Sequence, residues 1–282
     1  MLSYEATKHF RLFKNPFSAD ISGADDIFMS EEHRYIEAAM LDAARHQGFL
    51  AIVGQVGSGK SVIRKKAVME LEKDGKVRLI YPRIIDKTRV TASSLCDAIV
   101  LDLNPDAKPK TRLEQKSRQV EAALISSAQG GGISCLLIEE AHDLPVPALK
   151  LLKRFHEIEH KYQKTLGIIL VGQTELGDRL DERVHPEMRE VIQRCQVAQI
   201  RGLNGNLMDY LRLKFSRSRA DVAKIISEDG VQALSERLTV KDGRKSFSIA
   251  YPLTVNNYVT RAMNLAAEMG EPIVSAEVIN QL

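Results

Sequence analysis

The spacing of hydrophobic positions changes several times along this chain, and each change predicts an element. Residues 31–46 carry apolar side chains at helical intervals, which predicts an amphipathic helix. Residues 49–53, Phe-Leu-Ala-Ile-Val, then form a short and continuously apolar run. Such a run is typical of a strand that is buried on both faces of a sheet. A glycine-rich turn follows it, and helical spacing resumes from Ser61.

The same alternation continues up to about residue 200. Three further apolar runs predict strands over residues 77–85, 134–138 and 167–171. The helical spacings between and after them predict helices over residues 61–73, 92–103, 113–128, 147–163 and 186–194. Strands that alternate with helices in this order predict an α/β fold, with a parallel sheet flanked by helices.

Beyond Ile200 the pattern is helical, most clearly over residues 207–219, 229–238 and 254–269. We therefore expect two domains. The first covers residues 1–202 and consists of an N-terminal segment and an α/β core. The second covers residues 203–282 and is a small, all-helical domain.

Composition narrows the setting without deciding the function. The chain has 282 residues, a formal net charge of +3 and three scattered cysteines. This charge permits contact with nucleic acid but does not argue for it. Three cysteines are too few for a disulfide framework, which favours a reducing, cytoplasmic setting. No run approaches the roughly 18 apolar residues that cross a bilayer, so we expect no membrane partner.

Residues 54–61 match the pattern GxxxxGK[ST] completely, between a predicted strand and a predicted helix. In this pattern the backbone N–H groups of the loop and of the helix start surround phosphate groups. Lys60 supplies a positive charge for the β- and γ-phosphates, and the Ser61 hydroxyl is a ligand for Mg²⁺. The motif predicts an ATP site made by Gly54, Gln55, Val56, Gly57, Ser58, Gly59, Lys60 and Ser61.

Two carboxylates follow the apolar run that ends at Ile138, as in a Walker B motif. We expect Glu139 to orient Mg²⁺ through a water molecule and Glu140 to act as the general base for the attacking water. Aspartate is the usual residue at the first of these positions, so Glu139 is a departure with one additional methylene. A buried strand that merely ends in a solvated acidic turn is the alternative.

Polar residues further along the chain are candidates for sensing and completing the site. Gln173 follows the apolar run 167–171, where an amide can bind the γ-phosphate or the lytic water, or simply cap a helix. Arg194, and after it Arg189, can act as an arginine finger on the nucleotide of a neighbouring subunit. Surface arginines without a catalytic role remain the alternative for both.

Taken together, these motifs resemble those of AAA+ ATPases, and more narrowly the ExeA-like branch. The resemblance runs from about Tyr4 to Ala267 and rests on residues 13–17, the P-loop, residues 138–144, residues 170–176 and the pair Gln193-Arg194. It implies a nucleotide bound between the core and a helical lid, and subunits that assemble into a homo-oligomeric ring or filament.

The lid departs from the pattern of that branch at one position. The branch usually carries an arginine that senses nucleotide after a proline near residue 252. This chain has Leu253 and Thr254 there, so either this sensor is absent or a nearby residue such as Arg261 replaces it.

Two biological roles compete under this resemblance. The chain ends at Leu282, directly after the expected lid, and has no spanning segment, which favours the B-type target-selection ATPases of Mu-like phages and transposons. Such a protein binds double-stranded DNA as an ATP-dependent oligomer and recruits or activates a DDE transposase. A cytoplasmic ATPase of the ExeA/GspA kind that serves secretion-system assembly is the alternative, and an unrelated NTP-driven switch is the third possibility.

Local clusters of cations give the DNA hypothesis its candidate residues. Arg83, Lys87 and Arg89 follow the second predicted strand, where related ATPases present DNA-facing loops. Residues 201–224 carry six cations and two acids, a second basic segment. Cations in such positions neutralise phosphates without reading bases. A solvated basic face is an equally good interpretation of either cluster.

Overall fold

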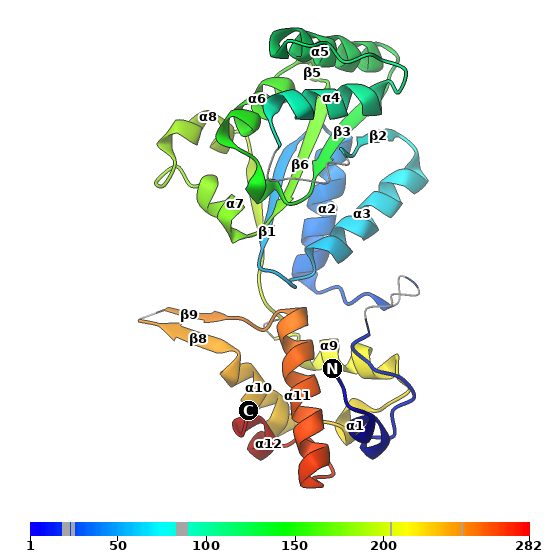
Figure 1. The fold of residues 1–282 in the computed structure, drawn as a ribbon, viewed down its shortest axis with the longest axis vertical. Coiled ribbons are helices and arrows are strands. Elements are labelled where there is room, and N and C mark those ends of the chain that lie inside the picture. Colours follow the sequence, from blue (N-terminus) through cyan, green and yellow to red (C-terminus); the bar gives the residue numbers. More distant parts are fainter. Residues whose placement is uncertain (19–22, 24–25, 83–89, 204, 244) are drawn as a thin grey trace. The chain divides into compact units, whose positions relative to one another are not determined.

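The structure is a computed structural model that describes residues 1–282 except 19–22, 24–25, 83–89, 204 and 244. The chain forms two compact units. The α/β unit comprises Glu32–Gln55 and Lys60–Ile200 (Figure 1). The helical unit comprises Met1–Glu31 and Arg201–Leu282, and Val56–Gly59 are grouped with it.

A five-stranded parallel sheet is the centre of the α/β unit, and its strand order is β2-β3-β6-β1-β7. The five strands are β1 (Phe49–Gly54), β2 (Val77–Ile80), β3 (Ile133–Ile138), β6 (Leu166–Gly172) and β7 (Gln196–Ile200). The predicted α/β fold is thus confirmed. Because the strands are parallel, their carboxyl ends meet at one edge of the sheet, where ligands bind in this class of fold.

Helices cover both faces of this sheet, as the continuous apolar runs require. Along β1, Phe49, Ala51 and Val53 pack into one buried cluster, while Leu50 and Ile52 pack into the cluster on the opposite face. Helices α2 (Glu31–Arg45) and α3 (Lys60–Asp74) cover the second face. Helices α4 (Ala92–Leu103), α5 (Leu113–Gln129) and α6 (Val146–His156) cover the first (Figure 1).

Two predictions for this unit are wrong in detail. Instead of a helix over residues 186–194, the chain forms a 3-10 turn η4 (Pro186–Met188), one turn of helix α8 (Arg189–Ile192) and then β7. In β7 only Ala198 and Ile200 are buried, so this edge strand has no continuous apolar run to reveal it. Helix α6 ends at His156, and a short hairpin of β4 (Glu159–His160) and β5 (Gln163–Lys164) follows it.

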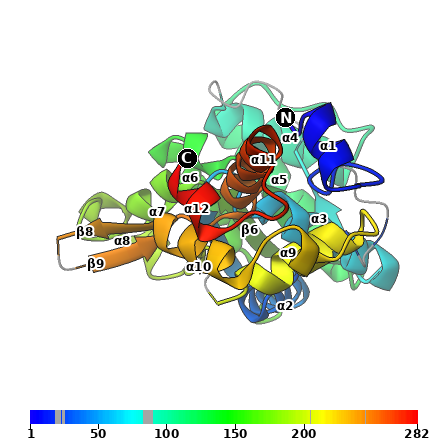
Figure 2. The same ribbon diagram turned by 90° about the horizontal axis from the view of Figure 1, so that it is seen from below.

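The helical unit has its own core around α11 (Pro252–Met269). Figure 2 shows α11 from below, among helices that come from both ends of the sequence. These are α1 (Tyr4–His9), α9 (Leu207–Ser216), α10 (Glu228–Arg237) and α12 (Ala276–Asn280). The prediction of an all-helical domain is wrong in one respect, because β8 (Thr239–Asp242) and β9 (Lys245–Ser248) form a hairpin in this unit.

The N-terminal segment packs in the helical unit, whereas the sequence placed it in a 1–202 core. Its aromatic side chains are the reason. Phe10 is 7% exposed and belongs to the buried cluster around α11. The rings of Phe17 and Phe28 pack edge-on against those of Phe215 and Tyr210, with centroids 5.7 and 5.5 Å apart. Among the described residues, none of the helices combines the length and hydrophobicity that crossing a bilayer requires.

Candidate active site

The phosphate-binding loop leaves the carboxyl end of the central strand β1 and enters α3 at Lys60. Gly57 and Gly59 have φ angles of +75° and +97°, which side-chain-bearing residues rarely adopt. These two glycines let the backbone curve back over the N-terminus of a 15-residue helix. The unpaired N–H groups at that helix start give the loop a positive electrostatic potential, which favours phosphate.

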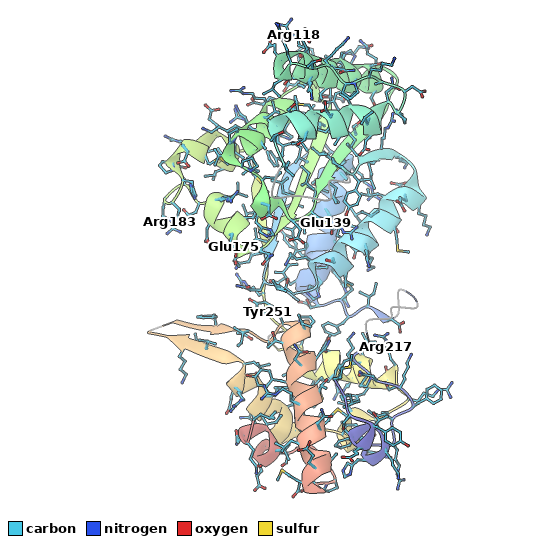
Figure 3. The ribbon with its side chains drawn as sticks, viewed as in Figure 1. Arg118, Glu139, Glu175, Arg183, Arg217 and Tyr251 are labelled. Carbon is cyan, nitrogen blue, oxygen red and sulfur yellow. The ribbon has the colours of Figure 1, made fainter. Side chains whose placement is uncertain are left out.

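The Lys60 ammonium group lies folded over this loop. It donates hydrogen bonds to the carbonyl oxygens of Gly54, at 2.7 Å, and Gln55, at 2.8 Å. Burial lowers the pKa of Lys60, and the carboxylates of Glu140 and Glu175 act in the opposite direction. Lys60 is therefore close to the carboxylates at the carboxyl edge of the sheet. A bound phosphate would replace the two carbonyl oxygens as the partner of its ammonium group. Figure 3 shows Glu139 and Glu175 at this end of the sheet.

The two carboxylates after β3 have different surroundings. Cys135 and Leu137 face α2 and α3, and alternation along the strand sends Glu139 to the same side. There its Oε1 lies 2.8 Å from Nε of Arg64, and its Oε2 accepts a hydrogen bond from the Tyr81 hydroxyl. Glu140 instead has a left-handed backbone, with φ 51° and ψ 38°, and a side chain that is 49% exposed. Glu139 is thus the carboxylate held in an ion pair, and Glu140 is the carboxylate that solvent can reach.

His142 connects Glu140 to Gln173 and was not predicted as a site residue. Its Nδ1 lies 3.6 Å from Oε2 of Glu140, and its Nε2 lies 3.1 Å from the side-chain amide nitrogen of Gln173. The Gln173 backbone N–H also points at Nδ1, at 3.4 Å. The histidine was visible only as part of the 138–144 motif, since nothing in the sequence showed that it would contact Gln173.

A close approach of two turns makes this bridge possible. Gly172 ends β6 immediately before Gln173. A Cβ atom at Gly172 would lie 2.8 Å from Cδ2 of Leu176 and 3.2 Å from the backbone nitrogen of His142. A larger residue would therefore push the turn that carries His142 away from the end of β6. The glycine keeps His142 and Gln173 within contact.

The candidate arginine fingers are engaged in surface ion pairs. Arg194 Nε lies 2.7 Å from Oε1 of Glu157, and Arg189 Nε lies 3.2 Å from Oε1 of Glu182. Their side chains are 40% and 66% exposed. Exposed pairs contribute only about 0–1 kcal/mol, so either arginine can be released to another partner at small cost. The role of either one as a finger stays a prediction.

The predicted DNA-contacting residues Arg83, Lys87 and Arg89 lie outside the residues that the structure describes. The second basic segment, residues 201–224, is not a free cationic face. Arg217 lies 3.2 Å from Asp26 with a side chain that is only 5% exposed, and Arg212 pairs with Asp209 at 3.0 Å. Arg219 stacks over the ring of Phe13. These pairings reduce the positive charge available to an external polyanion.

The donor set beside the P-loop fits a magnesium ion that arrives with a nucleotide. Ser61 and Arg64 are three residues apart and so lie on one face of α3, in its first two turns. Because Arg64 holds Glu139, a hydroxyl and a carboxylate are brought toward the same face of that helix. Among the described residues no cluster of three or more metal-binding side chains occurs. A magnesium ion beside the P-loop would take its remaining ligands from water and phosphate oxygens.

Comparison with known proteins identifies the unit that contains these residues. Residues 43–180 match the family model described as "AAA domain". This part of the chain is similar to an AAA domain. The match contains the P-loop, the two carboxylates after β3 and Gln173, so the similarity covers the candidate nucleotide site of the α/β unit.

One curated relative and two solved structures add detail. General secretion pathway protein A of Aeromonas hydrophila is 26% identical over 193 residues, which cover 67% of this chain and 33% of that protein. The chain therefore spans about a third of that relative. Cdc6p of Pyrobaculum aerophilum has a TM-score of 0.59 at 17% identity, over 92% of this chain and 67% of its own. Drosophila ORC bound to DNA also scores 0.59, at 13% identity, over 99% and 65%. These two structures show a shared fold.

Proposed function

We propose that this protein is a GspA-like AAA+ ATPase that works as a homo-oligomer in the assembly of a secretion apparatus. The likeness to general secretion pathway protein A carries this proposal, because it covers two thirds of the chain. ATP binding would favour the assembled state, and hydrolysis would reset it. The sequence motifs supported this role as the alternative to transposition.

The proposed chemistry assigns one task to each group at the carboxyl edge of the sheet. The P-loop N–H groups and Lys60 hold the phosphates, and Glu140 accepts the proton of the attacking water. Gln173, held by His142, orients that water or the γ-phosphate. Mg²⁺, where bound near Ser61 and Glu139, would neutralise charge on the phosphate oxygens. Arg194 of one subunit would stabilise the developing charge in its neighbour.

A genetic test addresses the secretion role directly. Deleting the gene from its host should leave normally exported proteins inside the cell, and the wild-type gene should restore export. A gene that carries Glu140→Gln should not restore it, because the proposal requires hydrolysis. Normal export in the deletion strain would contradict the proposal.

Target-DNA selection for a DDE transposase is a second candidate function. The fold likeness to Drosophila ORC bound to DNA favours it, since that likeness covers nearly the whole chain. In this role the ATP-bound oligomer would bind double-stranded DNA without sequence preference and release it with ADP. Arg83, Lys87 and Arg89 are the proposed contacts.

Fluorescence anisotropy of a labelled duplex tests this second role. With a non-hydrolysable ATP analogue the protein should bind every sequence alike, and ADP should abolish binding. Affinity should fall by roughly 10²-fold or more between about 50 and 200 mM salt through counterion release. Replacing Lys87 and Arg89 by alanine should flatten that salt dependence by about two charges. Absence of nucleotide-dependent binding at low salt would exclude the transposition role and leave the secretion role.

A further inference from the structure

The Walker B carboxylate Glu139 is fixed by two side chains from different elements. Arg64 comes from the first two turns of α3, and Tyr81 follows the last residue of β2. Each engages one oxygen of the carboxylate, Arg64 through an ion pair of 2.8 Å and Tyr81 through its hydroxyl. Arg64 also lies over the Tyr81 ring, with its guanidinium carbon 5.6 Å from the ring centroid. The three side chains thus contact one another pairwise.

The fold places these three side chains together for simple reasons. Strands β2 and β3 pair in parallel, with Leu79 opposite Cys135. Two residues further along, Tyr81 therefore lies beside Leu137, on the same face of the sheet. Glu139 follows on that face two residues later. On α3, Ile63, Ala67 and Leu71 are buried against the sheet, and Arg64 begins the adjoining stripe that faces the end of β2. The contact is therefore set by register and helix phase.

Burial makes this contact stronger than an ordinary surface pair. The Arg64 side chain is 14% exposed and that of Glu139 is 22% exposed. At this degree of burial the ion pair with Arg64, together with the hydrogen bond from the Tyr81 hydroxyl, restricts the carboxylate to one orientation. Aspartate at this position would have one fewer rotatable bond. A glutamate needs an external restraint to present its oxygens in a fixed place.

We propose that Arg64 and Tyr81 are positioning residues that hold the Glu139 carboxylate in place for Mg²⁺ and so compensate for its additional methylene. A carboxylate has about four lone-pair sites, so two protein donors leave room for a metal-bound water. The proposal rests on the proposed magnesium role of Glu139. If it is correct, changing either side chain should weaken the binding of Mg²⁺ and leave the binding of nucleotide without Mg²⁺ unchanged.

A cavity beside the pair makes this proposal testable without loss of the fold. Arg64 and Tyr81 line a space of about 560 Å³, together with Val68, Glu72 and Leu79. Removing a hydroxyl or shortening the arginine therefore enlarges an existing space and leaves the packed sheet intact. The variants Tyr81→Phe and Arg64→Gln change only the groups that contact Glu139. Lys65→Gln, at the next and exposed position of α3, is the matched control for the lost charge.

The experiment measures the affinity for a fluorescent ATP analogue as Mg²⁺ is varied, without hydrolysis. In the wild type the ion should strengthen binding, and failure of that result would remove the magnesium role itself. Tyr81→Phe and Arg64→Gln should each raise the half-maximal Mg²⁺ concentration roughly 10-fold, which is the low end of the effect of groups that orient metal ligands. Affinity without Mg²⁺ should stay unchanged, and Lys65→Gln should behave as wild type.

Combining each change with Glu139→Gln gives the decisive comparison. If both residues act through the carboxylate, neither variant should have a further effect once Glu139 is an amide. An undiminished effect in that background would overturn the proposal, and so would an unchanged Mg²⁺ requirement in the single variants. A lowered requirement would also overturn it, since it would mean that Arg64 competes with the ion. Tyr81→Phe keeps the ring, so it carries the test if Arg64→Gln does not fold.

Discussion

At the scale of single residues, adjacent carboxylates acquire different properties from one change of backbone. Glu139 continues the alternation of β3 and enters a partly buried ion pair with Arg64. Glu140 turns into the left-handed region and keeps its side chain accessible beside His142. An attacking water can reach an accessible carboxylate and give it a proton, whereas each oxygen of Glu139 already has a protein partner. The geometry therefore favours the assignment of the base role to Glu140.

Lys60→Ala should weaken ATP binding by roughly 100-fold. A charge-assisted hydrogen bond contributes about 1.5–3 kcal/mol, and each 1.4 kcal/mol is a factor of ten in affinity. Titration calorimetry with ATP measures the change, and Lys65→Ala removes an exposed lysine of the same helix as a control. If the Lys60→Ala protein keeps its affinity, the P-loop assignment is wrong.

Glu140→Gln should bind ATP normally and lose hydrolysis by about 10²–10⁴-fold, since an amide of the same shape cannot accept a proton. A phosphate-release assay beside a nucleotide-binding measurement separates the two effects. Wild-type turnover in this variant would mean that another residue is the general base, and Glu139 would be the first candidate.

At the scale of elements, the strands that are buried on both faces were predicted, and so was the edge strand β2, although the prediction over residues 77–85 extends beyond its end at Ile80. β1, β3 and β6 lie inside the sheet, and each is a continuous apolar run. The edge strand β7 buries only alternate residues near its end and therefore resembled a loop after a helix. The P-loop and Walker B candidates could be proposed from the sequence because they follow such strands. The contacts of Arg64, Tyr81 and His142 depend on register and helix phase, which one sequence does not display.

His142→Ala should reduce turnover about 5-fold with little change in ATP affinity. It removes the hydrogen bond to the Gln173 side-chain amide and the longer one from the Gln173 backbone N–H, and a typical bond contributes about 1 kcal/mol. His142→Gln can still bond an amide and should retain more activity than the alanine variant. Steady-state kcat and KM for both variants, with ATP binding measured separately, make the comparison. Equal turnover in the alanine variant and the wild type would leave Gln173 independent of His142.

At the scale of the whole molecule, the N-terminal segment stabilises the helical unit. Phe10→Ala should lower the free energy of unfolding of that unit by about 3 kcal/mol, because it leaves a cavity in the buried cluster. Phe13→Ala is the matched control, since Phe13 is 76% exposed. Denaturant unfolding measures both variants. Similar values for the two would mean that the segment contributes no core to the unit.

Assembly is also tested at this scale. Arg194→Ala should keep nucleotide binding in the monomer but depress hydrolysis, because a finger in trans acts only across an interface. Mixing Arg194→Ala subunits with Glu140→Gln subunits should restore part of the activity, since some interfaces then combine an intact arginine with an intact base. No recovery at any mixing ratio would indicate a structural role for the pair with Glu157.

The pairing of residues 1–31 with residues 201–282 has a consequence for synthesis on the ribosome. The α/β unit is inserted into the helical unit, so about 170 residues are translated between two halves that share one core. Phe10, Leu12 and Phe17 emerge long before α9 and α11, against which they pack. The α/β unit can fold as it emerges. Until α9 and α11 have been translated, the apolar side chains of the N-terminal segment stay exposed to solvent. A chaperone that shields this segment as it emerges would therefore act on this protein earlier than on one whose domains follow one another.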